Sequence, residues 1–371
     1  MSNHVLKKII QQCNSSPREK YNILTFPTHE RYETQLCKTG HNFFSFSMDG
    51  QKEWDTKQTK PPENYYILPK NELAAFTEID MVLVQSKFWQ FQVAAQILET
   101  LPVPMIVLEH TVPTPQTHNP EQVDAMRQMV GHVNIFISNF SKNAWNIQSP
   151  NNYVIHHGID SSVFKSLDIE KEEHILTVAN DFKNRDFCLN YSGWERITNG
   201  MNVRLVGSKN GEGSIVCDNA EDIVKEYNKC KIYLNTTTLS PIPMSLLEAM
   251  ACGCLPVVPA GGPTDDFIPD EIGLKLPVAK NNININDPGV FATKPGDAMT
   301  MMSSHTFINE PSGQHLEQAL KYIYHHHNKQ DLYKRLDDIP IKNNWNNVVD
   351  IYEGVINEVQ YREGTVRSRF G

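Results

Sequence analysis

Short apolar runs alternate with longer amphipathic stretches along the first part of the chain. The runs stand at 22–26, 42–46, 81–85, 104–110 and 134–138. They are short and rich in β-branched or aromatic residues, which is typical of buried strands. The amphipathic stretch after the first run, with Thr28 as N-cap and Gly40 as its stop, predicts a helix, and a second helical stretch extends through Ile97. Strands that alternate with helices predict a parallel sheet with helices on both faces.

The same alternation restarts after the segment 157–166. Apolar runs at 174–180, 203–208, 231–235 and 255–260 predict a second sheet of the same kind. Segment 157–166 then serves as the linker, with Gly158 as a hinge, whereas the polar, proline-bearing segment 47–64 is an excursion from the first sheet. We therefore expect an α/β protein of three parts: a Rossmann-like domain at 1–160, a second at 161–340, and a terminal helix with a tail at 341–371.

Length and composition agree with this division. A chain of 371 residues favours two domains, and 40% hydrophobic with 21% charged residues is ordinary for a globular protein. Neither a membrane-length apolar run nor a secretory leader is evident, and seven cysteines lack paired spacing, so we expect a cytoplasmic protein without membrane insertion. A net charge of -9 disfavours a non-specific nucleic-acid coat. Three consecutive histidines at 325–327 cannot all face one ion on a helix, so we assign them to a solvated face and expect no metal site.

The segment SPIPMSLLEAMACGCLPVVPAGG, residues 240–262, carries the most specific chemistry. Ligands of open α/β domains bind where strands end and helices begin. Prolines are tolerated before the helix, and the free N–H groups of Met244 and Ser245 favour an anion there. Glu248 stands in the apolar stretch LLEAMA, which leaves little room for a solvent-facing glutamate. A buried carboxylate that accepts ribose hydroxyls beside a phosphate-binding helix end predicts a nucleotide site.

This segment resembles the sugar-nucleotide signature of GT-B glycosyltransferases of family four. NIFISNFSKNAW followed by YVIHHGIDSSVF resembles the segment that joins the family's domains, and residues 343–358 resemble the terminal helix that crosses back onto the first domain. KTGHNFFSF resembles the opening of the acceptor domain. Several matches in the family's order cover most of the chain. The segments NDFKNRDF and NTTTLSPIPMSLLEAMACGC look most like those of virus-encoded, bacteriophage members. The location would then be the host cytoplasm.

The resemblance implies a donor site for a nucleotide-diphosphate sugar, most simply a UDP-sugar, and no cofactor. Its residues would be Ser240, Ile242, Met244, Ser245, Glu248, Gly261, Gly262 and Thr264. One departure is that Ser240 replaces the first of the family's two motif glutamates, which puts the identity of the sugar, hexose or pentose, and activity itself in question. A second departure is FPTHERY in place of a glycine-rich loop after the first strand.

The resemblance also implies an Arg/Lys pair that stabilises the charge of the leaving diphosphate, and Lys183 and Arg185 in NDFKNRDF stand at its place, directly after the second domain's first strand. The plain alternative is an exposed basic loop. His110 ends a strand of the first domain and resembles the family histidine that touches the donor sugar; the alternative is a capping or core histidine. The resemblance implies retaining transfer without a metal, in which the leaving phosphate oxygen takes the acceptor's proton.

The acceptor would bind the first domain, where His29, Arg31 and Trp54 are candidates for its side of the site. Virus-encoded sugar transferases often act on hydroxymethylated bases, so the resemblance implies such a base in phage DNA as our best expectation. Arg362, Arg367 and Arg369 in the tail would meet its phosphates, whereas the plain alternative is a solvated terminus. Saccharide and protein acceptors stay open, as does the oligomeric state. Alternatives from other classes are a sugar-nucleotide-binding protein without turnover and another nucleotide-dependent enzyme such as an epimerase.

Overall fold

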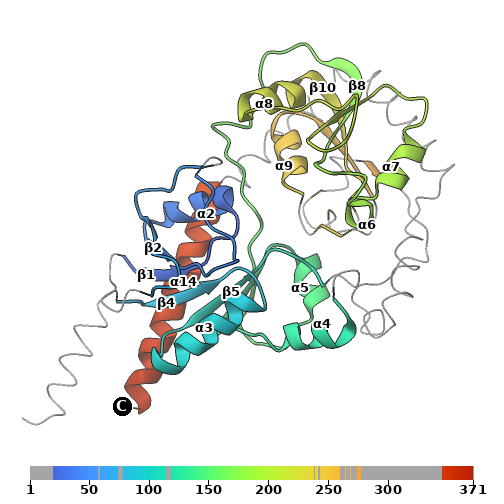
Figure 1. The fold of residues 1–371 in the computed structure, drawn as a ribbon. Helices are drawn as coiled ribbons and strands as arrows, with labels where there is room; N and C mark the ends of the chain where they lie inside the picture. The colour runs from blue at the N-terminus through green and yellow to red at the C-terminus, as the bar shows by residue number, and fades with distance from the viewer. Residues whose placement is uncertain are drawn as a thin grey trace, which may run out of the picture.

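The computed structural model describes residues 20–56, 59–73, 78–113, 118–237, 239–240, 243–259, 264, 268, 274–276 and 345–370. Figure 1 shows two α/β lobes and a long helix, α14 (Trp345–Phe370), that lies along the first of them. Each lobe is built on its own parallel sheet. The two-sheet arrangement expected from the hydrophobic pattern is therefore confirmed.

The first sheet has seven strands in the order β3-β2-β1-β4-β5-β6-β7, and every pairing in it is parallel. Its strands are β1 (Asn22–Thr25), β2 (Asn42–Ser45), β3 (Tyr65–Ile67), β4 (Met81–Val84), β5 (Met105–Glu109), β6 (Val133–Phe136) and β7 (Asn152–Val154). The helices between them are α2 (Glu30–Leu36), the 3-10 turn η1 (Cys37–Thr39), α3 (Trp89–Thr100), α4 (Pro120–Arg127) and α5 (Asn139–Trp145). All residues of β4, β5 and β6 are buried, as in a sheet covered on both faces.

The second sheet has five parallel strands in the order β12-β11-β10-β8-β9. Its strands are β8 (Glu172–Val178), β9 (Val203–Val206), β10 (Cys230–Leu234), β11 (Leu255–Pro259) and β12 (Leu274–Leu276). The helices of this lobe are α6 (Asp186–Leu189), α7 (Tyr191–Ile197), α8 (Ala220–Lys229) and α9 (Met244–Ala251). Helix α9 is apolar nearly all round and packs against β10 and β11, so the motif helix belongs to the core of this domain.

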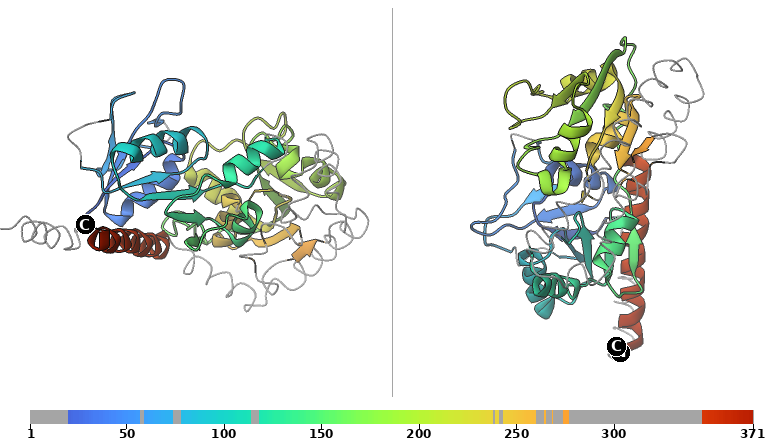
Figure 2. Two further views of the ribbon diagram at one scale, coloured as in Figure 1. Left: turned by 90° about the horizontal axis from the view of Figure 1, so that it is seen from below. Right: turned by 90° about the vertical axis from the view of Figure 1, so that its right-hand side faces the viewer.

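Helix α14 returns to the first domain, where it contacts α2 and η1 (Figure 2, right-hand view). Its buried side chains recur at helical spacing: Val348, Val349, Tyr352, Val355, Ile356 and Val359. The Tyr352 hydroxyl hydrogen-bonds that of Tyr32 on α2, and Tyr153 donates to Glu358 over 2.9 Å. The crossing-back helix predicted from residues 343–358 is confirmed, and its backbone continues to Phe370.

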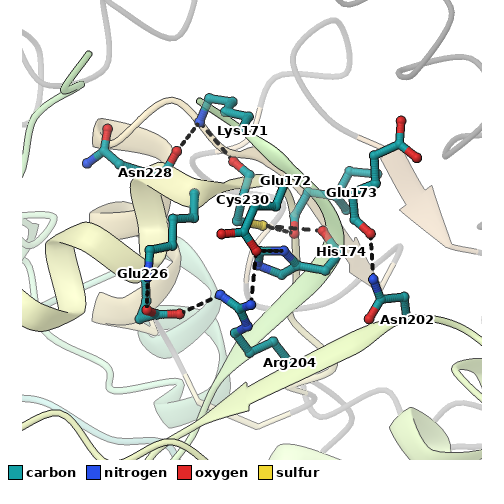
Figure 3. A network of polar contacts seen from close by, with 11 residues as sticks. Lys171, Glu172, Glu173, His174, Asn202, Arg204, Glu226, Asn228 and Cys230 are labelled. Carbon is teal, nitrogen blue, oxygen red and sulfur yellow. Dashed lines mark hydrogen bonds and ion pairs between the residues drawn. The ribbon is translucent and has the colours of Figure 1, made fainter. Parts of the chain in front are cut away.

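A polar network closes the amino-terminal edge of the second sheet (Figure 3). Arg204 on β9 bridges Glu172, at the start of β8, and Glu226, on α8, with N···O distances of 3.0 and 2.9 Å. Lys171 donates to the backbone carbonyls of Asn228 and Cys230. This network ties β8, β9 and α8 together at the amino ends of the strands. It therefore stabilises the domain at the end of the sheet that is remote from the expected donor site.

Three local expectations differ from the structure. The N-cap of α2 is His29 and not Thr28, because the Thr28 hydroxyl donates to the Phe26 carbonyl and accepts from Gln90. Segment 47–64 buries Trp54 and leads into β3, an edge strand that the sequence pattern did not indicate. Strands β7 and β12 were also missed because each has only three residues. The histidines at 325–327 lie outside the described residues.

Candidate functional site

The two domains meet through loops at the carboxyl ends of their strands. A small apolar cluster joins Val112 and Ala144 of the first domain to Leu239, in the loop between β10 and α9, with Phe140 and Cys188 packed against it. Another contact is an ion pair between Arg31 on α2 and Glu248 on α9. Because carboxyl-end loops carry the ligand sites of α/β folds, the surface between these domains is the candidate site.

Glu248 is the central carboxylate of this surface. It is buried, with 8% of its side chain exposed, and its Oε2 accepts a hydrogen bond of 3.0 Å from the Tyr227 hydroxyl on α8. Its Oε1 lies 3.1 Å from Nη2 of Arg31, whose side chain is 70% exposed. Burial raises the pKa of Glu248, while the Arg31 guanidinium and the Tyr227 hydroxyl lower it in opposition. One oxygen thus has a fixed partner inside its own domain and the other faces a cation from the opposite domain.

The amino end of α9 lies next to the domain interface. The N-cap residue is Pro243, and no side chain caps the first turn. The Ser245 hydroxyl hydrogen-bonds Tyr233 at 2.8 Å, which ties the first turn to β10. Met244, Ser245 and Ser240 are partly exposed, whereas Ile242 lies outside the described residues. An uncapped helix amino end with accessible N–H groups is suited to hold an anion.

Lys183 and Arg185 lie in the loop after β8, which hydrogen bonds tie to the loop after β9. Phe182 between the strand and these residues is buried, and its backbone N–H donates to Asn210 over 2.8 Å. Asn210 in turn donates to the Ala179 carbonyl over 2.7 Å, so the loops after β8 and β9 are tied together. Gly207 makes this approach sterically accessible, because a Cβ there would lie 2.0 Å from the Ala179 oxygen.

Both cations at the tip of this loop are exposed. Among the described residues, no carboxylate lies within ion-pairing distance of Lys183 or Arg185. Helix α6, which follows this loop, contacts the segment before α9, since Leu239 donates its backbone N–H to the Cys188 carbonyl over 3.3 Å. Two positive charges without a carboxylate partner among the described residues are suited to face a diphosphate group.

His110 follows β5 of the first domain and packs among aromatic rings. Its ring lies edge-on to His29 and Tyr32, with centroid distances of 5.0 and 4.8 Å, and stacks with His157 at 5.9 Å. Burial, reinforced by His29 and His157, holds the pKa of His110 well below its ordinary range, so the ring is neutral at physiological pH. A neutral imidazole has one N–H donor and one bare acceptor nitrogen.

A buried polar chain runs behind His110. Its Nε2 lies 3.1 Å from Oε1 of Gln85, and Nε2 of Gln85 donates to Oε1 of Glu33 over 2.6 Å. Glu33 also accepts from the Thr28 backbone N–H at 3.0 Å and from the Tyr65 hydroxyl at 2.9 Å. Both Gln85 and Glu33 are 2% exposed. Burial raises the pKa of Glu33 to about 7 despite these three donors.

We expect Glu33 to make unfolding pH-dependent. Its folded pKa of about 7 lies above the ordinary value of 4.5, so between these values the unfolded chain loses the proton first and stability falls as pH rises. The Glu33 contribution to the free energy of unfolding is fully present below pH 4.5, and about 3 kcal/mol of it is lost as pH passes through 7. In Glu33→Gln this component should vanish, so urea midpoints at pH 5 and pH 8 should differ less than in the parent chain.

The control for this experiment is Glu226→Gln. Glu226 is also a buried carboxylate, but hydrogen bonds from Lys229 and Arg204 outweigh its desolvation and lower its pKa, so it does not titrate between pH 5 and 8. Its replacement should leave the difference between the two midpoints unchanged. An undiminished difference in Glu33→Gln would contradict the assignment of the raised pKa.

The acceptor-side candidates occupy different environments. His29 and Arg31 are exposed on the interface side of α2. Trp54 is buried at 7% exposure, donates its indole N–H to the Thr59 carbonyl over 2.7 Å and packs on Tyr65 at 4.3 Å, so it has a packing role in this structure. Thr264 is fully buried, and its hydroxyl has no hydrogen-bond partner among the described residues. Gly261 and Gly262 lie outside the described residues.

Three site residues were missed by the sequence analysis. Tyr227 fixes Glu248, and Gln85 and Glu33 support His110. Gln85 ends an apolar run directly at a strand's carboxyl end, which was a usable signal; Tyr227 and Glu33 stand in ordinary helical patterns and gave none. In the described part of the chain, no group of three or more His, Cys, Asp or Glu residues is arranged to hold a metal ion. A helix long and apolar enough to cross a membrane is likewise absent from these residues.

No protein-family model matches the sequence, and no curated protein matches it either. Solved structures do resemble it. HepE from Anabaena in complex with UDP aligns with a TM-score of 0.64 at 12% identity, over 91% of this chain and 100% of that chain. The apo structure of OtsA aligns with a TM-score of 0.57 at 9% identity, over 92% and 99%. Sucrose-phosphate synthase from Thermosynechococcus elongatus gives 0.52 at 12% identity, over 85% and 99%. The chain therefore has the GT-B fold, with two Rossmann-like domains.

Proposed function

We propose that this protein is a glycosyltransferase that moves a sugar from a nucleotide-diphosphate sugar to an acceptor hydroxyl. The observation that carries the proposal is the buried carboxylate of Glu248 beside the uncapped amino end of α9, at the surface where the two domains meet. A carboxylate there is placed to accept hydroxyl hydrogen bonds from a ribose, and the helix end to hold phosphate. HepE, which shares the fold, was crystallised with UDP and with UDP-glucose.

The donor is a UDP-sugar in this proposal. Its ribose binds Glu248, its diphosphate lies against the first turn of α9, and Lys183 and Arg185 neutralise the charge that develops on the leaving group. Ser240 stands next to the sugar in place of a carboxylate. Since a serine forms fewer and weaker hydrogen bonds than a carboxylate, we propose that it limits contacts to the transferred hexose or pentose.

The reaction is retaining and metal-independent in this proposal. The bond between the anomeric carbon and the diphosphate oxygen breaks, and the acceptor oxygen bonds to the same face of that carbon. The acceptor's proton passes to the departing phosphate oxygen. Lys183, Arg185 and the dipole of α9 supply the positive charge that a cation supplies in other transferases. The apolar cluster that contains Val112, Ala144 and Leu239 helps to exclude water where the domains touch.

The acceptor in this proposal is a hydroxymethylated base of phage DNA, bound on the first domain at His29 and Arg31. Arg31 supplies a mostly exposed guanidinium beside the Glu248 carboxylate, and this guanidinium is suited to bind a phosphate or hydroxyl of an acceptor. A base within a duplex would have to leave the stack to reach this surface. Saccharides and proteins are the alternative acceptors, and the experiment below distinguishes them.

Incubation of the full chain with a panel of UDP-sugars and acceptors tests the function. We expect UDP release that depends on the acceptor, and a mass increase of one hexose or pentose on hydroxymethylated nucleosides from digested DNA. The product should keep the anomeric configuration of the donor, and EDTA should leave the rate unchanged. UDP-sugar binding with neither transfer nor hydrolysis would instead identify a binding protein, and a rearranged sugar nucleotide an epimerase. Mass increases on saccharides or peptides alone would exclude the DNA acceptor.

A further inference from the structure

The hydrogen bonds behind His110 fix its tautomer when Glu33 is ionised. Above its pKa of about 7 the Glu33 carboxylate can only accept, so the amide of Gln85 must present its NH₂ group, which lies 2.6 Å from Oε1 of Glu33 and 3.3 Å from the Thr25 hydroxyl. The amide oxygen of Gln85 is thereby turned toward His110, 3.1 Å from Nε2. An amide oxygen also can only accept, so Nε2 of His110 must carry the ring proton.

The other ring nitrogen is then a bare acceptor. The described residues provide no hydrogen-bond partner for Nδ1 of His110. This atom is also not one of the buried polar atoms without a partner, so it is accessible to a ligand. His110 itself is partly exposed at the carboxyl end of β5. His29 and Tyr32, both edge-on at about 5 Å, fix the plane of the ring. The ring therefore offers a lone pair of fixed direction to a ligand.

We propose that Glu33 and Gln85 are positioning residues that hold His110 in the single tautomer protonated on Nε2. They thereby leave Nδ1 bare toward the donor sugar, the ligand that the resemblance described above already implies for this histidine. The assignment of the ligand as a sugar rests on the proposed function; the assignment of the tautomer does not. A hydroxyl satisfies the bare nitrogen, whereas a carboxylate or phosphate oxygen at the same place would face it with a second lone pair. The site would thus select a neutral, hydroxyl-bearing sugar at this contact.

Nitrogen NMR of the full chain, labelled at histidine, tests the tautomer directly, because bare and protonated ring nitrogens have well-separated shifts. The spectra should be taken at pH 8, where Glu33, with its pKa of about 7, is largely ionised. Signals of His110 are assigned by their loss in His110→Asn. We expect a protonated Nε2 and a bare Nδ1 in the parent chain, and a mixture of tautomers in both Gln85→Met and Glu33→Gln.

Gln90→Met is the matched control. Gln90 is also 2% exposed, and its amide bonds the Gln85 backbone N–H and the Thr28 hydroxyl but neither His110 nor Glu33. It removes a buried amide from the same layer and should leave the His110 signals in place. A protonated Nδ1 in the parent chain, or an unchanged tautomer in a folded Gln85→Met, would overturn the positioning role. Should Gln85→Met fail to fold, Glu33→Gln supplies the same test. This variant keeps Gln85 and replaces Glu33 by a side chain of nearly the same volume.

A titration tests the sugar contact separately. The UDP-sugar that binds best in the panel should shift the Nδ1 signal toward that of a hydrogen-bonded nitrogen, and UDP alone should not. Gln85→Met should bind this UDP-sugar about tenfold more weakly and UDP equally well, as expected for the loss of one hydrogen bond. Equal shifts with UDP and the UDP-sugar would overturn the sugar contact. Absence of any UDP-sugar binding would count against the proposed function, while the tautomer in the ligand-free protein would still be decided.

Discussion

Replacement of both Lys183 and Arg185 by alanine should lower kcat for sugar transfer by at least about a hundredfold, or roughly 2.7 kcal/mol of transition-state stabilisation. The leaving diphosphate gains negative charge as the glycosidic bond breaks, so cations that face it contribute more in the transition state than in the bound donor. Binding of UDP-sugar should weaken by a smaller factor. The loop itself is tied by Phe182 and Asn210, so the double variant should keep its fold.

The matched control is the pair Lys225→Ala and Arg196→Ala. Both side chains are exposed in the second domain, on α8 and α7, and their removal subtracts the same charge from the chain. Initial rates with the acceptor found in the panel, at saturating donor, measure the effect for both double variants. If kcat falls equally in the two double variants, the effect comes from the net charge of the chain, and Lys183 and Arg185 do not face the leaving group. If binding of UDP-sugar falls more than kcat, they are ground-state contacts only.

The regular core of both domains was predictable because burial repeats along the chain. The runs at 81–85 and 104–110 became β4 and β5, every residue of which is buried, and such strands leave a continuous apolar pattern. The strands that this pattern did not predict were short or lay at an edge of a sheet. Strand β3 has only Tyr65 buried, while Tyr66 and Ile67 are exposed, so a burial pattern could not indicate it.

The candidate site was predictable only where a residue contradicted its surroundings. A glutamate inside LLEAMA is out of place on an apolar helix, and this drew attention to Glu248. Its partners gave no such signal, because Arg31 is 217 positions away and Tyr227 lies on a different helix. Pairings of this kind are set by how the domains and helices meet in space, and a single sequence does not encode them in local periodicity.

Trp54 illustrates a different difficulty. The sequence made it one candidate for the acceptor side, and in the structure its ring packs on Tyr65 and its N–H donates to a carbonyl within the same segment. Loops of this length keep their shape by burying an aromatic side chain against the domain. Composition alone does not distinguish such an anchor from a binding residue, since both require a large ring with one polar atom.

The second large effect concerns nucleotide binding. We expect Glu248→Ala to weaken UDP binding about a hundredfold, because the variant loses two hydrogen bonds from ribose hydroxyls to a buried carboxylate, each of the order of 1.5 kcal/mol. Calorimetric titration with UDP measures this without any acceptor. Removal of the carboxylate also leaves Arg31 without its partner, but an exposed guanidinium is readily solvated, so this loss should add little to the cost.

Two variants separate ribose recognition from a general loss of structure. Glu226→Gln alters another buried carboxylate, in the network at the opposite end of the sheet, and should leave UDP affinity unchanged. Tyr227→Phe keeps the Glu248 carboxylate but frees its Oε2, so UDP affinity should fall only several-fold, through looser positioning. If Glu248→Ala binds UDP as tightly as the parent chain while remaining folded, the ribose lies elsewhere and the ion pair with Arg31 is only a tie between the domains. A loss that appears equally in Glu226→Gln would point to the stability of the second domain instead of to a contact with the nucleotide.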